Sequence, residues 1–459
     1  MSREYRVSRR GFFGRSAKMA AAGAAIPYLI PAGVFGAGNR PGANERIGVA
    51  AVGVGPRGAW VSHEAGKMGE MVAVCDVDRR AAANFAQAYD GRPGTYADYR
   101  EVLERDDVDV VIVGTPDHWH AKICIDAMRA GKDVYCEKPL TVTVAEGKLL
   151  EKVVEETGAV LQVGTQQRTE YNGWFLEAVA IARSGRLGRN LEALVSLDPA
   201  PVHGERQGPF APEEPPPELN WDLWQGPAPE RPFTPNRIGW NFRWWWEYSG
   251  GQVTDWGIHH ADIALWALGA EASGPEEVEG KGEPPPGIPE DFDLNAYLSG
   301  ELELPGLYTV FLEFDCTLRL ANGNAINLVS RGNEIIIGGE LGRIRVNRGG
   351  LTGRPIEEIR ASEVESEWLQ EEVARLYRGM RRTCHMGNFF DCVENRQLPI
   401  SDVFTHNRAM EVAHTANIAM LLRRKLHWDP ERREFEDDAE ANASGIVRRP
   451  QRAPWTIEA

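Results

Sequence analysis

The chain has 459 residues, of which 42% are hydrophobic and 26% charged, a composition typical of a globular protein and not of a disordered one. This length exceeds what one compact core usually serves, so we expect two domains. The formal net charge of −16 would repel phosphate backbones, which excludes nucleic acid as an expected partner.

The first 40 residues differ in composition from the rest of the chain. They hold seven basic residues and one acidic residue, which leaves a net charge of −22 on the remainder. The segment SRRGFF at 8–13 resembles a twin-arginine export signal, and an Ala/Gly-rich apolar run follows at 19–38. A basic amphipathic start or a membrane anchor is the alternative, but Pro27 and Pro31 disfavour a stable span. We expect residues 1–40 to be a leader for export to the periplasm or cell envelope, with no membrane span after its removal.

The six cysteines form neither a CxxC pair nor a zinc-ligand spacing, so we expect no metal site from them. Cys75 and Cys136 are expected in buried strands, where cysteine acts as a small hydrophobic residue. Pairing of Cys384 with Cys392 is an alternative to the reduced thiols that we expect. Reduced thiols fit a chain that folds in the cytoplasm before export.

Residues 41–165 have the pattern of an α/β domain, because short apolar runs alternate with helical stretches. The expected strands are 47–52, 71–75, 108–113, 133–136 and 159–163, and the expected helices include 81–88, 120–130 and 144–157. This alternation predicts a doubly wound parallel sheet with helices on both faces.

The character of the chain changes after Gly164, where proline-rich loops and many tryptophans appear. The expected strands there are 307–314, 325–330, 334–337 and 343–346, and the expected helices are 386–394 and 407–426. We expect an α+β domain over 166–430 with a large, mostly antiparallel open sheet, and a C-terminal tail over 431–459.

A glycine-rich turn follows the first expected strand. Gly53, Gly55 and Gly58 match the pattern G-x-G-x-x-G, and Pro56 and Arg57 lie between them. Such glycines permit a tight turn, a close approach of the backbone to a pyrophosphate and close helix packing. A glycine turn without a nucleotide is the alternative.

Asp76 ends the second expected strand, 23 positions after Gly53. A carboxylate there accepts hydrogen bonds from ribose hydroxyls and repels a 2′-phosphate, which favours NAD over NADP. Arg79 and Arg80 follow directly and leave NADP open. The glycine turn and Asp76 together predict a Rossmann nucleotide-binding domain.

The segment after the third core strand is expected at the same edge of the sheet. Thr115, Pro116, His118 and His120 open a helix there, and we expect them to line the nicotinamide pocket. Capping of this helix by Asp117 is a compatible alternative.

The strand 133–136 is followed by Glu137 and Lys138, and then by Pro139, which prevents its continuation. Ligands bind at the carboxyl edge of open α/β sheets, so we expect Lys138 to act on a ligand. A buried ion pair between Lys138 and a helix end is the alternative.

Asp255 and His259 are spaced i and i+4, which places them on one face of an expected helix. A carboxylate beside a histidine fixes its tautomer and raises its basicity, as a general base requires. Mutual capping at a helix end is one alternative. A metal site that includes Asp262 is another, but no third strong ligand has a clear spacing.

An aromatic stretch at 240–246 leads into that segment. Trp240 and Trp244 offer faces that pack on the C–H faces of sugar rings, and Arg243 offers donors for hydroxyls or a carboxylate. A tryptophan-rich core or a dimer contact is an equal alternative.

These motifs occur in the order found in the Gfo/Idh/MocA oxidoreductases, which include glucose–fructose oxidoreductase and inositol dehydrogenase. The chain resembles this family over about residues 46–430, and its leader resembles that of the exported branch. The Glu-Lys-Pro motif at 137–139 and the distant Asp255/His259 pair make the resemblance specific.

The resemblance implies roles for individual residues. Lys138 would hydrogen-bond the reacting hydroxyl, His259 would remove its proton, and hydride would leave for the nicotinamide. Asp255 would orient His259 and contact the sugar. Glu137 would meet the nicotinamide ribose, and Arg168 would lie near the entrance of the active site.

The expected site has two overlapping sets of residues. The cofactor set is Gly53, Gly55, Pro56, Arg57, Gly58, Asp76, Thr115, Pro116, His118, His120, Glu137, Lys138 and Gln166. The substrate set is Arg168, Trp240, Arg243, Trp244, Asp255, His259 and His260.

We therefore expect an exported, NAD-dependent oxidoreductase that acts on a secondary hydroxyl of a sugar, a polyol or a sugar derivative. One rival is a glycoside hydrolase or lyase that uses NAD transiently, through oxidation, elimination, addition and reduction. A non-catalytic sugar-binding protein is the second rival. Free NAD is scarce outside the cytoplasm, so we expect NAD to be bound before export and retained. The resemblance also implies a homodimer or homotetramer formed through the open face of the second sheet.

Overall fold

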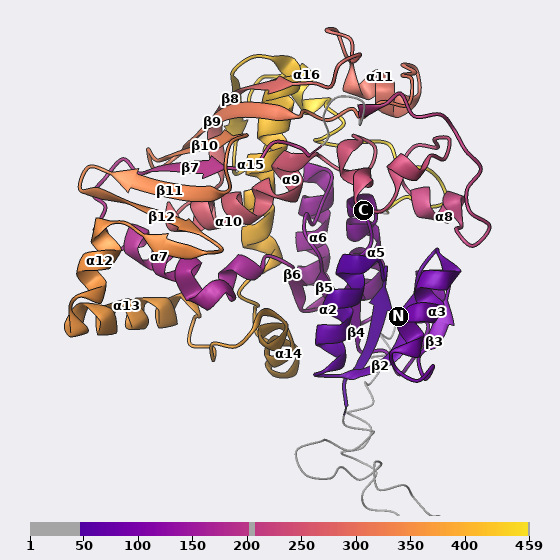
Figure 1. The fold of residues 1–459 in the computed structure, drawn as a ribbon, viewed down its shortest axis with the longest axis horizontal. Helices are drawn as coiled ribbons and strands as arrows, with labels where there is room; N and C mark the ends of the chain where they lie inside the picture. Colours follow the sequence, from indigo (N-terminus) through magenta and orange to yellow (C-terminus); the bar gives the residue numbers. More distant parts are fainter. Residues whose placement is uncertain (1–45, 202–206, 458–459) are drawn as a thin grey trace, which may run out of the picture. The chain divides into compact units, whose positions relative to one another are not determined.

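The computed structural model describes residues 46–201 and 207–457 and contains two sheets, each with its own helices (Figure 1). The expected leader at 1–40 lies outside the described residues. Both sheets belong to one unit that begins at Ile47. Their strand order and direction confirm the expected α/β class with a second α+β domain. None of the described helices is long and apolar enough to cross a bilayer.

The first sheet is entirely parallel, with the strand order β3-β2-β1-β4-β5-β6. Its strands are β1 (Gly48–Val52), β2 (Glu70–Cys75), β3 (Gly94–Tyr96), β4 (Val110–Val113), β5 (Asp133–Cys136) and β6 (Leu161–Val163). Its helices are α2 (Pro56–Gly66), α3 (Arg79–Gln87), α4 (Tyr99–Leu103), α5 (Asp117–Arg129) and α6 (Val144–Thr157). Strands β1 and β4 are buried at every position, as their continuous apolar sequences require. The order of strands reverses beside β1, and such a reversal opens a ligand crevice at the carboxyl edge.

Helix α6 shows how local sequence sets an element of this domain. The Thr143 side chain accepts a hydrogen bond from the backbone N–H of Glu146, and the Glu146 carboxylate accepts one from the N–H of Thr143. This capping box satisfies donors that the first helical turn leaves without partners. Gly158 ends the helix in the left-handed region at φ 67°. The bounds agree with the predicted helix at 144–157.

The second sheet has nine strands in the order β13-β12-β11-β7-β10-β9-β8-β14-β15. Its pairs are antiparallel except for β7 with β10, which are parallel. The strands are β7 (Glu192–Ser196), β8 (Pro275–Glu283), β9 (Glu313–Leu320), β10 (Ala325–Val329), β11 (Glu334–Gly339), β12 (Gly342–Asn347), β13 (Gly350–Thr352), β14 (Leu426–Asp429) and β15 (Glu434–Phe435). The helices that follow β6 in the chain are α7 (Trp174–Arg183), α8 (Trp221–Gln225), α9 (Gln252–Asp255), α10 (Gly257–Ala267), α11 (Leu294–Ser299), α12 (Arg354–Arg360), α13 (Glu363–Leu376), α14 (His385–Asn395), α15 (Val403–Leu422) and α16 (Ala439–Asn442). Of these, α14 packs on the first sheet.

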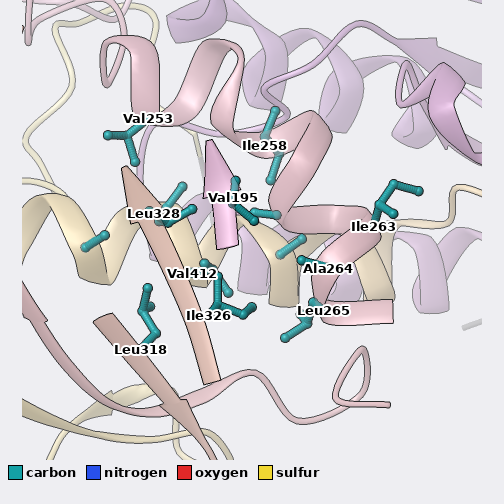
Figure 2. Packing of buried hydrophobic residues seen from close by; sticks show 14 of the residues in the cluster. Val195, Val253, Ile258, Ile263, Ala264, Leu265, Leu318, Ile326, Leu328 and Val412 are labelled. Carbon is teal, nitrogen blue, oxygen red and sulfur yellow. The ribbon is translucent and has the colours of Figure 1, made fainter. Parts of the chain in front are cut away.

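Helix α10 is anchored on this sheet by apolar side chains (Figure 2). Ile258, Ala264 and Leu265 lie against Val195 of β7 and Leu328 of β10 in one buried cluster. Every residue of α10 is buried, which removes the solvent-facing side that most helices keep. Because α10 also carries the predicted base, this packing fixes the position of that residue.

The predicted strand at 307–314 is wrong for most of its length, because β9 begins at Glu313. Residues 307–312 are buried, but their backbone bonds go largely to loops. The N–H of Thr309 donates to Trp244 O at 2.9 Å, and the N–H of Leu312 donates to Glu283 O at 2.8 Å. The apolar sequence therefore indicated burial correctly, while the segment meets a neighbouring strand at its end, where Leu312 bonds to Glu283, the last residue of β8.

The segment after residue 430, which we expected to be a C-terminal tail, packs against both domains. Arg449 donates to Trp246 O at 2.9 Å in the second domain. Trp455 is 6% exposed, and its ring meets the ring of Trp119 on α5 edge-on at 5.4 Å. The segment thus adds to the cores of both sheets.

Candidate active site

A cavity of about 890 Å³ lies at the carboxyl edge of the parallel sheet. Its wall combines residues that follow β1, β2, β4 and β5 with residues of the second domain. The predicted site residues that line it are Gly53, Gly55, Pro56, Arg57, Gly58, Asp76, Thr115, Pro116, Glu137, Lys138, Gln166, Trp240, Arg243, Asp255 and His259. Open α/β sheets bind their ligands at this edge.

The glycine turn has the close contacts that a dinucleotide fold needs. Gly53 has φ 79°, and a Cβ atom on it would lie 2.6 Å from the backbone nitrogen of Thr115. A Cβ on Gly58 would lie 1.9 Å from Gly53 O, so only glycine lets α2 approach the turn. Gly55 has open space where its Cβ would be, on the cavity side of the helix start. That space and the first N–H groups of α2 fit a pyrophosphate.

Asp76 closes the other end of the turn. Its Oδ2 accepts from the N–H of Val54 and its Oδ1 from the N–H of Asp78, both at 2.8 Å. Each carboxylate oxygen keeps a further lone pair for a ribose hydroxyl. Arg79 and Arg80 do not line the cavity; Arg80 is exposed and interacts with Asp78 and Glu218 instead. The residues at this end therefore fit NAD.

Glu137 accepts hydrogen bonds from two side chains beside the predicted nicotinamide position. Its Oε1 accepts from Arg57 at 2.9 Å and from Gln166 at 3.1 Å. Its Oε2 is buried and has no hydrogen-bond partner among the residues that the structure describes. A buried acceptor without a donor is costly, so this atom fits a donor on a bound cofactor.

Lys138 and Arg243 share one carboxylate. Lys138 Nζ donates to Asp255 Oδ1 at 2.7 Å and to Asp255 O at 2.8 Å, and Arg243 Nε donates to the same Oδ1 at 2.8 Å. Burial alone would raise the pKa of Asp255, but the charges of Arg243 and Lys138 outweigh burial and lower it. An ammonium group has three donor hydrogens, so Lys138 keeps one for a ligand in the cavity.

The expected hydrogen bond between Asp255 and His259 does not form. Asp255 Oδ2 and His259 Nδ1 are both buried and without partners in the described part of the chain. The reason is that Asp255 ends α9, and the helix is interrupted at Trp256 before α10 begins. Two cations then compete for the carboxylate more strongly than a neutral imidazole can.

His259 nevertheless has the properties of a proton acceptor. It lines the cavity and is 5% exposed. Burial lowers the pKa of His259 well below its usual value, and the positive charges of Lys138 and Arg348 lower it further. The imidazole is therefore neutral at physiological pH and can take up a proton in a reaction.

Two predicted histidines of the cofactor set support the site without lining it. His118 Nε2 lies 3.0 Å from Trp224 O, near the carboxyl end of α8 in the second domain. The ring of His120 lies 2.7 Å from Pro139 O and 2.8 Å from Thr115 O. His120 thus holds the turns after β4 and β5 together, and with them the backbone beside Lys138.

Three predicted residues of the substrate set also lie outside the cavity. Arg168 donates from Nε and Nη2 to Asp262 at 2.7 Å each, deep in the second domain and not at an entrance. His260 Nε2 lies 2.9 Å from Asn333 Oδ1 and anchors α10. Trp244 is completely buried in the core of the second domain. Their sequence positions do not distinguish these three residues from the ones that line the cavity, and the distinction becomes visible in the tertiary contacts of the folded chain.

Sequence analysis missed many residues of the cavity wall, including three polar or aromatic residues of the second domain. Tyr171, Trp256 and Arg348 line the cavity from three separate parts of the second domain. The position of Trp256 between Asp255 and His259 was a usable signal. No sequence signal points to Tyr171 or Arg348, because long-range packing brings them to the cavity.

Comparison with known protein families gives two matches, both in the Gfo/Idh/MocA group. Residues 47–165 match the description "Oxidoreductase family, NAD-binding Rossmann fold". Residues 203–285 and 363–457 match "Oxidoreductase family, C-terminal alpha/beta domain". Together these matches cover more than half of the chain and include both domains.

Curated relatives match over a shorter stretch. Glycosyl hydrolase family 109 protein 1 of Shewanella sp. (strain ANA-3) is 34% identical over 159 residues, which are 32% of each chain. Inositol 2-dehydrogenase of Salmonella typhimurium is 32% identical over 123 residues, which are 27% of this chain and 36% of the enzyme. The chain thus matches about a third of the length of these relatives.

Solved structures resemble the chain over most of its length. The WlbA dehydrogenase of Bordetella pertussis, in complex with NADH and UDP-GlcNAcA, gives a TM-score of 0.56 at 18% identity. The similarity covers 83% of this chain and 98% of that one, and it shows a shared fold.

Proposed function

Because the chain belongs to the Gfo/Idh/MocA oxidoreductase family, we propose that it transfers hydride between NAD and a secondary hydroxyl of a sugar, a polyol or a sugar derivative. The observation that carries this proposal is the meeting of Lys138, Asp255 and His259 in the cavity that the glycine turn also lines. An amine donor and a neutral imidazole beside a nucleotide site are the groups that oxidation of an alcohol needs.

The side chains divide the work on the substrate hydroxyl. The third N–H of Lys138 donates to the hydroxyl oxygen and stabilises the negative charge that develops on it. His259 accepts the hydroxyl proton on its ring. Bound NAD would supply the hydride acceptor. Asp255 holds Lys138 in place through two hydrogen bonds.

The cofactor is held from both ends of the cavity. The backbone at Gly55 and the start of α2 would receive the pyrophosphate, and Asp76 the adenosine ribose. Glu137 offers its buried, unpartnered Oε2 to the nicotinamide end. This arrangement supports NAD as the nucleotide and retention of the cofactor between turnovers.

The test is incubation of the purified protein, with its bound nucleotide, with a panel of sugars, polyols and glycosides. Absorbance of reduced nicotinamide and the masses of the products are followed together. We expect formation of a ketone product with reduction of the bound NAD. A protein that purifies without nucleotide and reduces added NAD with no compound of the panel would contradict the proposal.

A second candidate function is glycoside cleavage by transient oxidation, elimination, addition of water and reduction. It is favoured by the similarity to glycosyl hydrolase family 109 proteins and to an alpha-N-acetylgalactosaminidase from Shewanella oneidensis, which is 33% identical over 159 residues. Lys138 and His259 serve this sequence of steps as well. Release of a free sugar from a glycoside without net formation of NADH would favour it over the first candidate.

Export through the twin-arginine route is part of the proposal and rests on the sequence at 8–13. NAD bound before export and recycled within the site would free the enzyme from external cofactor. A fusion of residues 1–40 to a reporter that folds in the cytoplasm tests whether this segment directs export. Retention of the fusion in the cytoplasm would contradict it.

We also propose a homodimer or homotetramer formed through the second sheet. Glu313, Asp315 and Arg319 alternate with buried residues along β9 and leave one face of that strand exposed. Light scattering of the purified protein tests the oligomeric state, and a monomer at micromolar concentration would contradict the proposal.

A further inference from the structure

Arg348 is a cation of the active-site cavity that the proposed reaction does not use. It lies in the turn between β12 and β13. Its guanidinium carbon is 4.9 Å from the centre of the Tyr171 ring and 4.4 Å from the centre of the Trp256 ring. Aromatic faces attract a guanidinium group and orient its plane. Two rings, rather than a carboxylate, therefore hold Arg348.

The other cations of the cavity are engaged by carboxylates. Lys138 and Arg243 share Asp255, and Arg57 pairs with Glu137 at 2.9 Å. In contrast, no ion pair to Arg348 forms within residues 46–201 and 207–457. Its buried Nε has no hydrogen-bond partner there. The donors of this guanidinium are thus left for a ligand.

The surroundings disfavour the charge of Arg348 in the absence of a ligand. Burial is the largest influence and lowers its pKa, and the positive charge of Arg57 also lowers it, although Tyr171, Asp255 and Glu137 act in the opposite direction. Arg348 is half-buried, and a partly desolvated cation without an ion-pair partner is unfavourable, so an anion beside it would offset that effect. The guanidinium fork matches the oxygen spacing of a carboxylate or a phosphate.

The backbone that carries Tyr171 is also unusual. Tyr171, Asn172 and Gly173 are consecutive residues in the left-handed region, with φ of 57°, 55° and 77°. This conformation is strained for a bulky residue such as tyrosine. Strain of this kind persists where the fold holds a residue in place, and it is concentrated at ligand sites. Here it places the Tyr171 ring against Arg348.

We propose that the substrate is a sugar that bears an anionic group, a carboxylate or a phosphate ester, and that Arg348 binds this group. The inference rests on the proposed function, because it assigns a substrate class to the same cavity. Trp256 connects the two parts of the site, since its ring contacts Arg348 and lies 5.8 Å from the ring of His259. The anionic group would then dock beside the reacting hydroxyl and orient the sugar.

The pyrophosphate of the cofactor is the competing anion. It is expected at the glycine turn of the first domain, whereas Arg348 belongs to a hairpin of the second domain. The two assignments differ in what they predict for the cofactor. If Arg348 bound the pyrophosphate, its replacement would release the nucleotide.

The experiment measures binding without turnover, by calorimetry of the full chain with NADH bound. Glucuronate and glucose 6-phosphate are each compared with glucose, and gluconate with glucitol. The variants are Arg348→Gln, which removes the charge, and Arg348→Lys, which keeps it but loses the planar fork. Arg343→Gln is the matched control, because Arg343 is exposed on the neighbouring strand β12. This substitution changes the net charge by the same amount as Arg348→Gln.

We expect at least one anionic sugar to bind about tenfold or more tightly than its uncharged counterpart. Arg348→Gln should weaken binding of that anion by about 10- to 100-fold and leave the uncharged sugar and NADH unaffected. Arg348→Lys should fall between, and Arg343→Gln should match the wild type. Preference for the uronate or aldonate arm identifies a carboxylate, and preference for the phosphate arm identifies a phosphate ester.

Three results would overturn the inference: no preference for any anionic sugar, a preference that Arg348→Gln leaves intact, or loss of NADH from that variant at unchanged thermal stability. Failure of the proposed function has a different signature. In that case no sugar reduces bound NAD, while the preference for anions and its dependence on Arg348 persist.

Discussion

Lys138 Nζ lies 2.7 Å from Asp255 Oδ1, and this ion pair joins the two domains at the active-site cavity. Lys138 lies two residues after the end of β5 in the first domain, and Asp255 ends α9 in the second. The amine is therefore positioned by both domains at once. Relative movement of the domains would displace the proposed catalytic amine, so catalysis and domain packing depend on the same contact.

Replacement of Lys138 by methionine tests the role of the amine. Methionine keeps an unbranched side chain but removes the donor, so we expect kcat for sugar oxidation to fall by about 100- to 10,000-fold. The content of bound NAD should not change, because the glycine turn and Asp76 remain. Lys152→Met, on the exposed side of α6, is the control. Equal activity of the two variants would contradict the proposed mechanism.

Asp255→Asn should destabilise the fold. It leaves Lys138 and Arg243 without a buried counter-charge, which costs about 3–5 kcal/mol in the free energy of unfolding. The pKa of Asp255 is lowered in the folded state, so its contribution is present above the unfolded pKa of about 4 and is lost as the pH falls below it. Urea unfolding at neutral and acidic pH measures the difference. Asp315→Asn, exposed on β9, should show no such effect.

The nucleotide side of the site was predictable because its residues lie directly after strands. Gly53, Asp76 and Lys138 follow β1, β2 and β5, and parallel strands bring such positions to one edge. Order along the chain therefore translates into proximity without knowledge of long-range packing. In contrast, the sequence did not predict strand β8, because its residues PEEVEGKGE are rich in glycine and charge and have a weak β-strand propensity. Pairing with β9 and β14 outweighs that propensity in the folded chain.

The substrate side was only partly predictable, because residue type does not tell which way a side chain points. Trp240 and Trp244 belong to one aromatic stretch, yet Trp240 is 54% exposed on the cavity and Trp244 is buried in the core. Arg168 was expected at the entrance, but Asp262, 94 positions away, binds it inside the domain. Contacts of this range come from the packed fold and not from a local pattern.

His259→Asn tests the proposed base. Since burial and nearby positive charges hold the pKa of His259 well below its usual value, the base is already deprotonated at neutral pH. We expect kcat/KM of the wild type to stay level from about pH 8 to about pH 6, without the inflection near 6.5 of an ordinary histidine. The variant should lose about 100- to 10,000-fold in kcat. A wild-type inflection near pH 6.5 would contradict a neutral, buried His259.

Asp117→Asn should stabilise the folded protein at about pH 8 but not below about pH 4. Asp117 is 3% exposed, Ser249 donates to it at 2.5 Å, and burial raises its pKa to about 7. Between the unfolded pKa of about 4 and a pH of about 7, the folded state binds this proton and the unfolded chain does not, so stability rises as the pH falls. Above that range the ionised carboxylate costs about 2–4 kcal/mol, which the variant should recover at about pH 8.

Urea unfolding at several pH values checks this expectation for Asp117. The gain of Asp117→Asn should shrink through about pH 7 and vanish below about pH 4. Ser249→Ala is the companion variant, because loss of a donor that lowers the pKa of Asp117 should move the transition to higher pH. A gain that does not depend on pH would mean that Asp117 does not titrate in this range.

Arg168→Met separates a role in stability from a role at the site. Arg168 and Asp262 form a buried, bidentate ion pair, and Arg168 Nη1 also donates to Ile400 O at 2.8 Å. The variant leaves Asp262 as a buried charge without its partner, which costs about 3–5 kcal/mol in the free energy of unfolding. Affinity for NAD and for sugars should stay the same in the folded protein, because Arg168 lies outside the cavity.

The double variant Arg168→Met, Asp262→Leu is the control for that expectation. Replacement of both charges by apolar side chains removes the uncompensated carboxylate, so it should restore most of the stability that the single variant loses. The coupling free energy between the two positions, obtained from the unfolding free energies of the single and double variants in urea, should then be about 2–4 kcal/mol. An Arg168→Met variant that keeps its stability but loses affinity for sugars would place Arg168 at the entrance, as the family resemblance implied.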